Sequence, residues 1–178
     1  GYKLVKGWGP ERHVYFTALF SKPFRDFGIM QDTIPVKYNT NRFRSSLEAW
    51  GKDLRFWMRF PTRQGEVVTV KTAVSAVSSD GAKLNMQELE GKTFASLKAE
   101  GEKLWEGQLS KFKIEATPEQ RETFYTSVYH AFLHPFIFQD ADGKFRELDK
   151  NIGQAEGFTN YTVFSLWDTY RALHPLFN

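Results

Sequence analysis

Apolar and polar positions in the first part of the chain follow the short, alternating pattern of β-strands. Three apolar-rich segments lie between turn signals: His13 to Phe20, Leu54 to Phe60 and Val67 to Ala76. The last two alternate imperfectly, which is typical of antiparallel strands with one wetter face. Because Pro61 and Gly65 punctuate the stretch between them, a hairpin is the simplest interpretation.

The β pattern extends over the region from about His13 to Glu88. Within it, the more polar stretch from Asp26 to Gly51 has room for additional strands joined by a loop around Asn39-Thr40-Asn41. The pattern leaves the number of strands there open.

Near Gly91 the pattern becomes helical. From Thr93 to Phe112 apolar residues recur at steps of mostly three and four positions: Phe94, Leu97, Leu104, Trp105, Leu109 and Phe112. A second helix is predicted to begin after Thr117, because Pro118 suits the first helical position and Gln120 completes a capping box. Pro135 should end it, since proline cannot donate to the helical ladder.

Two further elements are predicted towards the C-terminus. The segment from Phe136 to Leu148, centred on Asp140-Ala141-Asp142-Gly143, is predicted to be a hairpin, because Asp and Gly tolerate tight-turn angles. The same acidic spacing begins a calcium loop, but the closing Glu of an EF-hand is missing, which favours the turn. Ser165 to Leu173 is predicted to be a third helix, with Ser165 as N-cap and Asp168 at the third helical position.

Strands followed by helices, without βαβ alternation, predict a β region that leads into an α region. We expect β structure in residues 1–92, a connecting helix in 93–116 and the start of a helical domain in 117–178. The helical part is too short to close a bundle or toroid by itself. Its apolar faces therefore need either the β region or further helices.

Composition narrows the functional classes. The 178 residues are 41% hydrophobic, which suits a sizeable core, and the net charge of +3 is spread along the chain. A spread charge argues against nucleic-acid binding, which requires a clustered basic surface. The sequence has no cysteine, so disulfides and cysteine-zinc sites are excluded. No apolar run approaches the roughly 20 residues of a membrane span.

No residue is predicted to be catalytic or to bind a metal. His130 and His134 share a helix face, but the intervening Ala131-Phe132-Leu133 lacks the Glu of zinc proteases. His13 and His174 are interpreted as capping or packing residues. The sequence shows no nucleophile paired with a base and no glycine-rich phosphate loop.

Trp167 and Asp168 are the candidate substrate-binding residues. Asp168 is predicted to lie in the first turn of a helix, where exposed amides favour an ionised carboxylate that accepts hydrogen bonds. Trp167 beside it could lie against a sugar ring. The structural alternative is that Asp168 completes a capping box and pairs with Arg171, while Trp167 enters the core. Spacing alone favours this alternative.

The segment from Phe164 to Pro175, with the sequence FSLWDTYRALHP, resembles glycoside hydrolase family 92. So do Val14-Tyr15-Phe16 with Phe20 to Phe24, the stretch Val77 to Asn85, and Phe124 to His130. These similarities extend over nearly the whole chain, and the C-terminal segment is the most specific of them.

The resemblance implies an internal fragment of a calcium-dependent α-mannosidase. It implies part of an antiparallel β-sandwich, joined through helices to the start of an incomplete α/α toroid. Such enzymes remove terminal α-linked mannose with inversion. The resemblance places Trp167 and Asp168 in the mannose pocket, and it places the catalytic carboxylates and the calcium ligands beyond Asn178, so that the fragment alone should be inactive.

The resemblance also implies partners and a location. α-Mannoside glycans and the remainder of the parent polypeptide are the expected partners, and no nucleic acid or membrane span is expected. A secreted or periplasmic location follows from the family. A non-catalytic carbohydrate-binding β-sandwich is the alternative function, because aromatic residues make up 16% of the chain.

Overall fold

The computed structural model describes residues 1–6, 11–35, 49 and 51–178. The loop predicted around Asn39-Thr40-Asn41 lies outside the described residues. The chain forms two compact units. One contains Gly1–Ala18 together with Thr72–Asn178, and the other is Leu19–Lys71.

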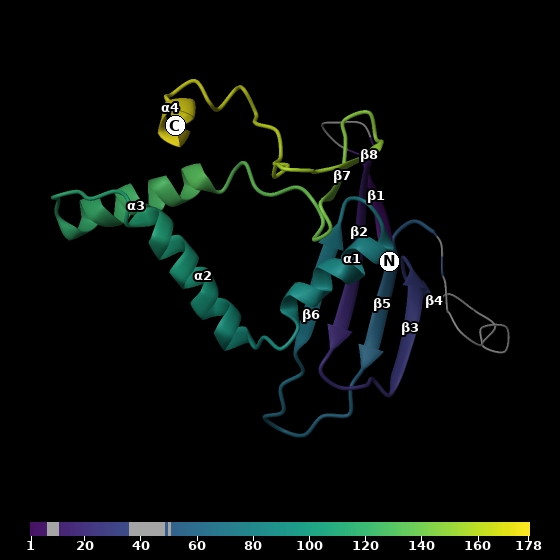
Figure 1. The fold of residues 1–178 in the computed structure, drawn as a ribbon. Coiled ribbons are helices and arrows are strands. Elements are labelled where there is room, and N and C mark those ends of the chain that lie inside the picture. The colour runs from purple at the N-terminus through teal and green to yellow at the C-terminus, as the bar shows by residue number, and fades with distance from the viewer. Residues whose placement is uncertain (7–10, 36–48, 50) are drawn as a thin grey trace. The chain divides into compact units, whose positions relative to one another are not determined.

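The first sheet has the strand order β1-β2-β6, with β1 at Tyr2–Val5, β2 at Arg12–Phe20 and β6 at Val70–Ser75 (Figure 1). β1 and β2 are antiparallel, and their register runs from Tyr2 opposite Tyr15 to Val5 opposite Arg12. Exposed and half-buried side chains alternate along most of β2, as expected of a strand with one wetter face. The strands predicted at His13 to Phe20 and Val67 to Ala76 are confirmed.

The second sheet lies within the Leu19–Lys71 unit and has the order β4-β3-β5. β3 is Asp26–Gln31, β4 is Ile34–Pro35 and β5 is Leu54–Arg59. The β3–β5 register is antiparallel. These elements confirm both the strand predicted at Leu54 to Phe60 and additional strands after Asp26.

Contacts between aromatic rings, and the close approach of one ring to a glycine, stabilise the Leu19–Lys71 unit. A side chain at Gly28 would lie 2.5 Å from the Trp57 ring, so the cross-strand neighbour leaves no space for one. Phe24 contacts the rings of Phe20, Phe27 and Phe60 at centroid distances of 5.5–6.4 Å. Phe24 is exposed and the other three rings are half-buried, so these rings shield only part of their apolar area from water.

The predicted hairpin between β5 and β6 is wrong. β5 pairs with β3, whereas β6 belongs to the sheet of β1 and β2. Two hydrogen bonds between Ser21 and Thr69 explain the difference. The Ser21 amide donates to the Thr69 carbonyl at 2.9 Å, and the Thr69 amide donates to the Ser21 side-chain hydroxyl at 3.0 Å. These bonds hold the approach to β6 against the end of β2.

The prediction of β structure as far as Glu88 is also wrong, because a helix intervenes. α1 is Ser79–Met86 and continues into a 3-10 turn, η2, at Gln87–Leu89. The Ser78 hydroxyl caps α1 by accepting the Gly81 amide at 2.9 Å. Ala82 is fully buried, and Figure 1 shows α1 beside β6. Ser78 at the N-cap, followed by Asp80 in the first turn, is the local sequence signal for this helix.

Two predicted helices are confirmed, the second of them with its predicted cap at Thr117. α2 is Phe94–Leu109 and α3 is Pro118–Phe132. Thr93 and Thr117 cap them, each in a reciprocal capping box. Rings fill the seam between the helices, with Trp105 and Tyr129 at 4.4 Å and the Tyr125 hydroxyl donating to the Phe112 carbonyl at 2.8 Å.

The C-terminal region forms a short hairpin and a last helix. β7 is Lys144–Arg146, β8 is Ile152–Gln154 and α4 is Leu173–Phe177. The hairpin connection lies at 147–151, closed by the Glu147 amide donating to the Asn151 carbonyl. The hairpin predicted around Asp140 is therefore corrected: that segment is a turn that leads into β7. The order of antiparallel sheets followed by helices confirms the predicted fold class.

None of the helices in the described ranges is both long enough and apolar enough to cross a membrane. The domain limits at residues 92 and 116 stay a prediction.

Candidate functional site

Trp167 and Asp168 lie in a run of turns between β8 and α4. The turns extend over residues 166–172, so the helix predicted from Ser165 is wrong, and α4 begins only at Leu173. Ala172 precedes α4 in the left-handed conformation, with φ of 61°, which interrupts a continuous helix. Short helices also need a packed apolar face, and the side chains of this segment are mostly exposed.

The side chains of the candidate pair face solvent. Trp167 is 89% exposed, and Asp168 is exposed as well. The Asp168 amide donates to the Ser165 carbonyl at 3.1 Å, which closes a turn. Arg171 lies over the Tyr170 ring at 5.2 Å, and in the described part of the chain no ion pair joins it to Asp168. The alternative of a buried Trp167 with an Asp168–Arg171 pair is therefore not what the structure shows.

The segment that leads to this loop is fixed by main-chain pairing. Ile137 and Tyr161 form an antiparallel bridge. The Thr162 amide donates to the Phe136 carbonyl at 2.9 Å, and the His134 ring lies 2.7 Å from the Val163 carbonyl. His134, considered as a possible metal ligand in the sequence, is thus engaged with this segment.

A cluster of rings fixes the two ends of the loop. Phe164, just before the loop, contacts His174 at 5.1 Å and Phe177 at 5.8 Å. Phe177 in turn contacts Phe132 at the end of α3, at 5.4 Å. Thr169 inside the loop is only 8% exposed. The ring contacts therefore hold the two ends of the loop together, and Thr169 is buried within it. Trp167 and Asp168 stay accessible to solvent.

A buried carboxylate lies before the same segment. Asp140 is 5% exposed, and each of its oxygens accepts a hydrogen bond. The Ser75 hydroxyl donates to Oδ2 at 2.6 Å, and the Asn85 side-chain amide donates to Oδ1 at 2.8 Å. The Asn85 oxygen accepts the Ala141 amide at 2.7 Å. We call Asp140, Ser75 and Asn85 the Asp140 cluster.

Arg146 on β7 makes a second connection to the chain after β6. Its guanidinium donates to the Ala76 carbonyl at 2.7 Å and to the Val77 carbonyl at 3.1 Å. A third donor reaches the Lys150 carbonyl at 2.8 Å. The planar fork of arginine supplies donors in several directions, which a lysine cannot do.

The Asp140-Ala141-Asp142-Gly143 turn is confirmed. The Gly143 amide donates to the Asp140 carbonyl at 2.8 Å, and Gly143 has φ of 81°, which favours glycine. Lys144 donates to the Asp142 carboxylate at 2.7 Å, and this hydrogen bond lowers the pKa of Asp142 and raises that of Lys144. The Asp142 carboxylate is therefore engaged within the turn, whereas the Asp140 carboxylate is held by Ser75 and Asn85.

The described residues contain no group of three or more His, Cys, Asp or Glu side chains placed to hold a metal ion. The calcium implied by the family resemblance thus has no matching donor set in the described ranges.

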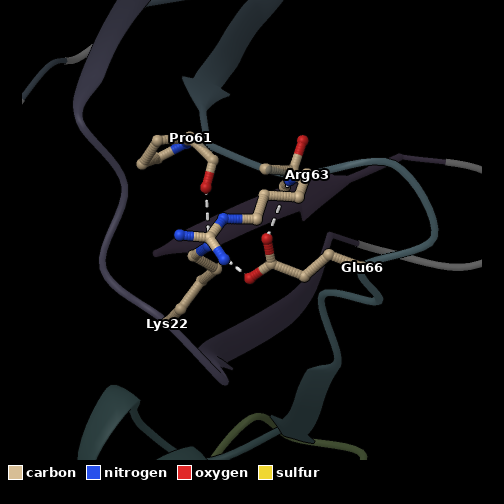
Figure 2. Close-up of a pocket in the computed structure, with 5 residues that line it drawn as sticks. Lys22, Pro61, Arg63 and Glu66 are labelled. Carbon is tan, nitrogen blue, oxygen red and sulfur yellow. Dashed lines mark hydrogen bonds and ion pairs between the residues drawn. The ribbon is translucent and has the colours of Figure 1, made fainter.

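A shallow pocket of ≈ 550 Å³ lies in the Leu19–Lys71 unit, lined by Lys22, Pro61, Thr62, Arg63 and Glu66. Figure 2 shows the Lys22 amino group between its two partners, the Pro61 carbonyl at 2.6 Å and the Glu66 carboxylate. The Lys22 hydrogen bond, helped by the Arg63 amide, holds the pKa of Glu66 below its usual value. Because Lys22 and Glu66 are paired with each other and with the main chain of Pro61 and Arg63, we interpret this pocket as a contact that holds the 61–66 loop in place.

Sequence reasoning missed the partners of Asp140. Asp140 and Ser75 are 65 positions apart, and the region that contains Asn85 was interpreted as β structure. The signal for α1 was present in Ser78 followed by Asp80 in the first turn. Nothing in the spacing pointed to the Ser75–Asp140 contact.

The chain matches two family models. Residues 1–75 match the glycosyl hydrolase family 92 N-terminal domain, and residues 81–178 match the glycosyl hydrolase family 92 catalytic domain. The chain therefore belongs to glycosyl hydrolase family 92. A search of curated proteins found no match.

Solved structures agree with the family. A family 92 α-mannosidase from Bacteroides thetaiotaomicron is 68% identical over 99% of this chain, with a TM-score of 0.92. The same enzyme has also been solved in complex with mannoimidazole. A family 92 inverting mannosidase from Bacteroides thetaiotaomicron is 25% identical over 93% of this chain, with a TM-score of 0.76. The chain spans 24% and 22% of the length of these two relatives.

Proposed function

We propose that this chain is the part of a family 92 α-mannosidase that contributes Trp167 and Asp168 to the mannose-binding pocket. The observation that carries the proposal is the accessible pair on an anchored loop, in a chain 68% identical to an α-mannosidase. The polypeptide that contains the chain would remove terminal α-linked mannose from glycans.

The two side chains have complementary roles. An exposed indole offers a flat apolar face to the C–H groups of a sugar ring. An ionised carboxylate beside it accepts hydrogen bonds from sugar hydroxyls, and such charge-assisted bonds are about twice as strong as neutral ones. The arrangement suits recognition of a polyol, and Asp168 is proposed as an acceptor without a role in proton transfer.

The inverting outcome is part of the proposal. Inversion requires one carboxylic acid and one carboxylate roughly 6.5–9.5 Å apart, with a water between them. We propose that this pair and the calcium ligands belong to the part of the enzyme that lies outside this quarter of the relative's length. The antiparallel strands would then belong to a β-sandwich, and the helices would begin an α/α toroid.

A hybrid enzyme tests the proposal. In the 68% identical α-mannosidase, the segment matched by this chain is replaced by the chain itself; we call the product the hybrid mannosidase. We expect it to release mannose from an aryl α-mannoside, with inversion observed by proton NMR of the first product formed. A folded hybrid without activity, or one that gives retention, would contradict the proposal.

The alternative is a non-catalytic carbohydrate-binding module. It is favoured by exposed aromatic residues on β5, since Phe56 is 52% exposed and Trp57 is 38% exposed. Titration of the chain with mannosides separates the two functions. Binding that is lost in Phe56→Ala but kept in Asp168→Ala would favour the module over the pocket.

The location is proposed from the family alone. A secreted or periplasmic enzyme would meet α-mannoside glycans outside the cytoplasm. Fractionation of the producing cells, with activity found in the cytoplasm, would contradict it.

A further inference from the structure

We propose that Asp140 is a positioning residue for the loop of residues 165–172. Asp140 acts at a distance from the proposed substrate-binding pair. It holds the turn at residues 140–143, and the strand-like segment just before this turn pairs with the residues that lead into the loop. The inference rests on the proposed function for its consequence on activity, and on geometry for the coupling itself.

The cluster requires a carboxylate at position 140. Both oxygens face donors, with the Ser75 hydroxyl at 2.6 Å and the Asn85 amide nitrogen at 2.8 Å. The Ser75 oxygen already accepts the Val77 and Ser78 amides, at 2.9 and 3.2 Å, so its hydrogen is directed to Asp140. An amide at position 140 would face a donor with its own NH2 group in either orientation.

The local field favours the charge. The carboxylate lies against the first turn of α1, where a side chain added at Gly81 would come within 2.1 Å of Oδ2. The positive end of a helix dipole stabilises a carboxylate at this place. Two donors and the dipole thus offset the burial of a group that is only 5% exposed.

A continuous series of contacts leads from Asp140 to the loop. The neighbouring Gln139 side chain accepts the Asn160 amide at 2.7 Å, and the Asn160 side chain donates to the Phe138 carbonyl at 2.7 Å. Asn160 precedes Tyr161, whose bridge to Ile137 continues towards Val163 and the ring of Phe164. A shift of the turn at Asp140 would therefore displace the base of the loop.

The cluster also joins the two matched regions of the family. Ser75 is the last residue of the N-terminal-domain match, whereas Asn85 and Asp140 belong to the catalytic-domain match. The position of the loop is thereby coupled to the end of β6. The geometry points to a carboxylate that orients the loop relative to the sheet.

Fluorine NMR tests the coupling in the chain itself. The five tryptophans are replaced by 5-fluorotryptophan, and Trp167→Phe assigns the Trp167 signal. Asp140→Asn should shift or broaden the Trp167 signal and leave that of Trp57 unchanged. Asp80→Asn is the matched control, because it makes the same charge change on α1 at a side chain that is 90% exposed. It should leave both signals in place.

A swap variant makes the test independent of folding defects. The double variant Asn85→Asp with Asp140→Asn keeps the charge and restores a donor–acceptor pair between the two positions, but it removes the Asn85 donor to the Val74 carbonyl at 2.9 Å. We expect the Trp167 signal to return towards its original position. If Asp140→Asn alone gives no dispersed spectrum, the swap is compared with Asn85→Asp alone, which loses the same donor to the Val74 carbonyl. A Trp167 signal closer to its original position in the swap supports the proposal, and an equal displacement in the two variants contradicts it.

Activity of the hybrid mannosidase gives the second readout. Asp140→Asn should lower kcat/KM about tenfold or more, and the swap should recover a part of it, while Asp80→Asn stays within about twofold. A folded Asp140→Asn variant with an unchanged Trp167 signal and unchanged kcat/KM would overturn the proposal. If the unaltered hybrid is inactive, the proposed function fails, and the fluorine experiment still decides the coupling.

Discussion

The Ser75 hydroxyl donates to the Asp140 carboxylate at 2.6 Å, across 65 positions of sequence. This bond attaches the turn before β7 to the end of β6, next to the first turn of α1. Gly81 belongs to the same contact, because it is the residue without a side chain that lets the carboxylate approach the helix.

Gly81→Ala should destabilise the chain. The added methyl would lie 2.1 Å from the Asp140 carboxylate and 2.7 Å from the Ser75 hydroxyl, and overpacking of this kind costs about 1–3 kcal/mol. Gly101→Ala in α2 is the control, because no atom lies within 4 Å of the added carbon. Gly101→Ala should raise the free energy of unfolding by about 0.5–1 kcal/mol. Urea unfolding of both variants measures the difference, and an equal effect would contradict the prediction.

Thr117→Ala should weaken α3. Thr117 accepts the Gln120 amide at 3.3 Å, and its own amide donates to the Gln120 side chain at 3.1 Å. Loss of the N-cap should lower the free energy of unfolding by about 0.5–2 kcal/mol. Thr126→Ala changes an exposed threonine within the same helix and should stay within about 0.5 kcal/mol. Thermal unfolding that ranks the two variants in the opposite order would refute this assignment.

Low pH should break the ion pair between Lys22 and Glu66. The Lys22 hydrogen bond lowers the pKa of Glu66 below its usual value, so the stabilisation by this contact is complete above the pKa that Glu66 has in the unfolded chain. That contribution is lost as the pH falls through the lower pKa of the folded state. Carbon-13 NMR titration should place the Glu66 midpoint below that of an exposed glutamate, and Lys22→Gln should raise it. A midpoint unaffected by Lys22→Gln would show that the contact is absent in solution.

Trp167 and Thr169, two positions apart in the 165–172 loop, should differ sharply in their effect on stability. Trp167→Ala should change the free energy of unfolding by less than about 0.5 kcal/mol, because its side chain is 89% exposed. Thr169→Ala should lower it by about 1 kcal/mol, since Thr169 is 8% exposed and donates to the Leu166 carbonyl. Calorimetry that finds Trp167→Ala the more destabilising change would place that indole in a core.

Local chemistry explains which elements could be predicted from sequence. Thr117, Pro118 and Gln120 are neighbours in sequence, so the start of α3 could be derived from them. The pairing of β6 with β2 could not, because strand order depends on contacts such as Ser21 with Thr69. The cap of α1 was a local signal that the apolar pattern around it concealed.

The candidate site divides in the same way. Trp167 and Asp168 are adjacent, and the prediction that they bind substrate rests on one specific sequence segment. The prediction of a helix there failed at Ala172, whose left-handed conformation no propensity scale would favour. The contribution of Asp140 could not be predicted, because its two partners come from positions 75 and 85.

The most direct test of the account is the effect of Asp168→Asn on the hybrid mannosidase. The substitution keeps the shape of an exposed side chain and removes a charged acceptor. We predict a loss in kcat/KM of about 10- to 100-fold, the amount expected for hydrogen bonds to a charged group, with an unchanged unfolding temperature. A kcat/KM within about twofold of the unaltered hybrid would contradict the placement of Asp168 in the mannose pocket.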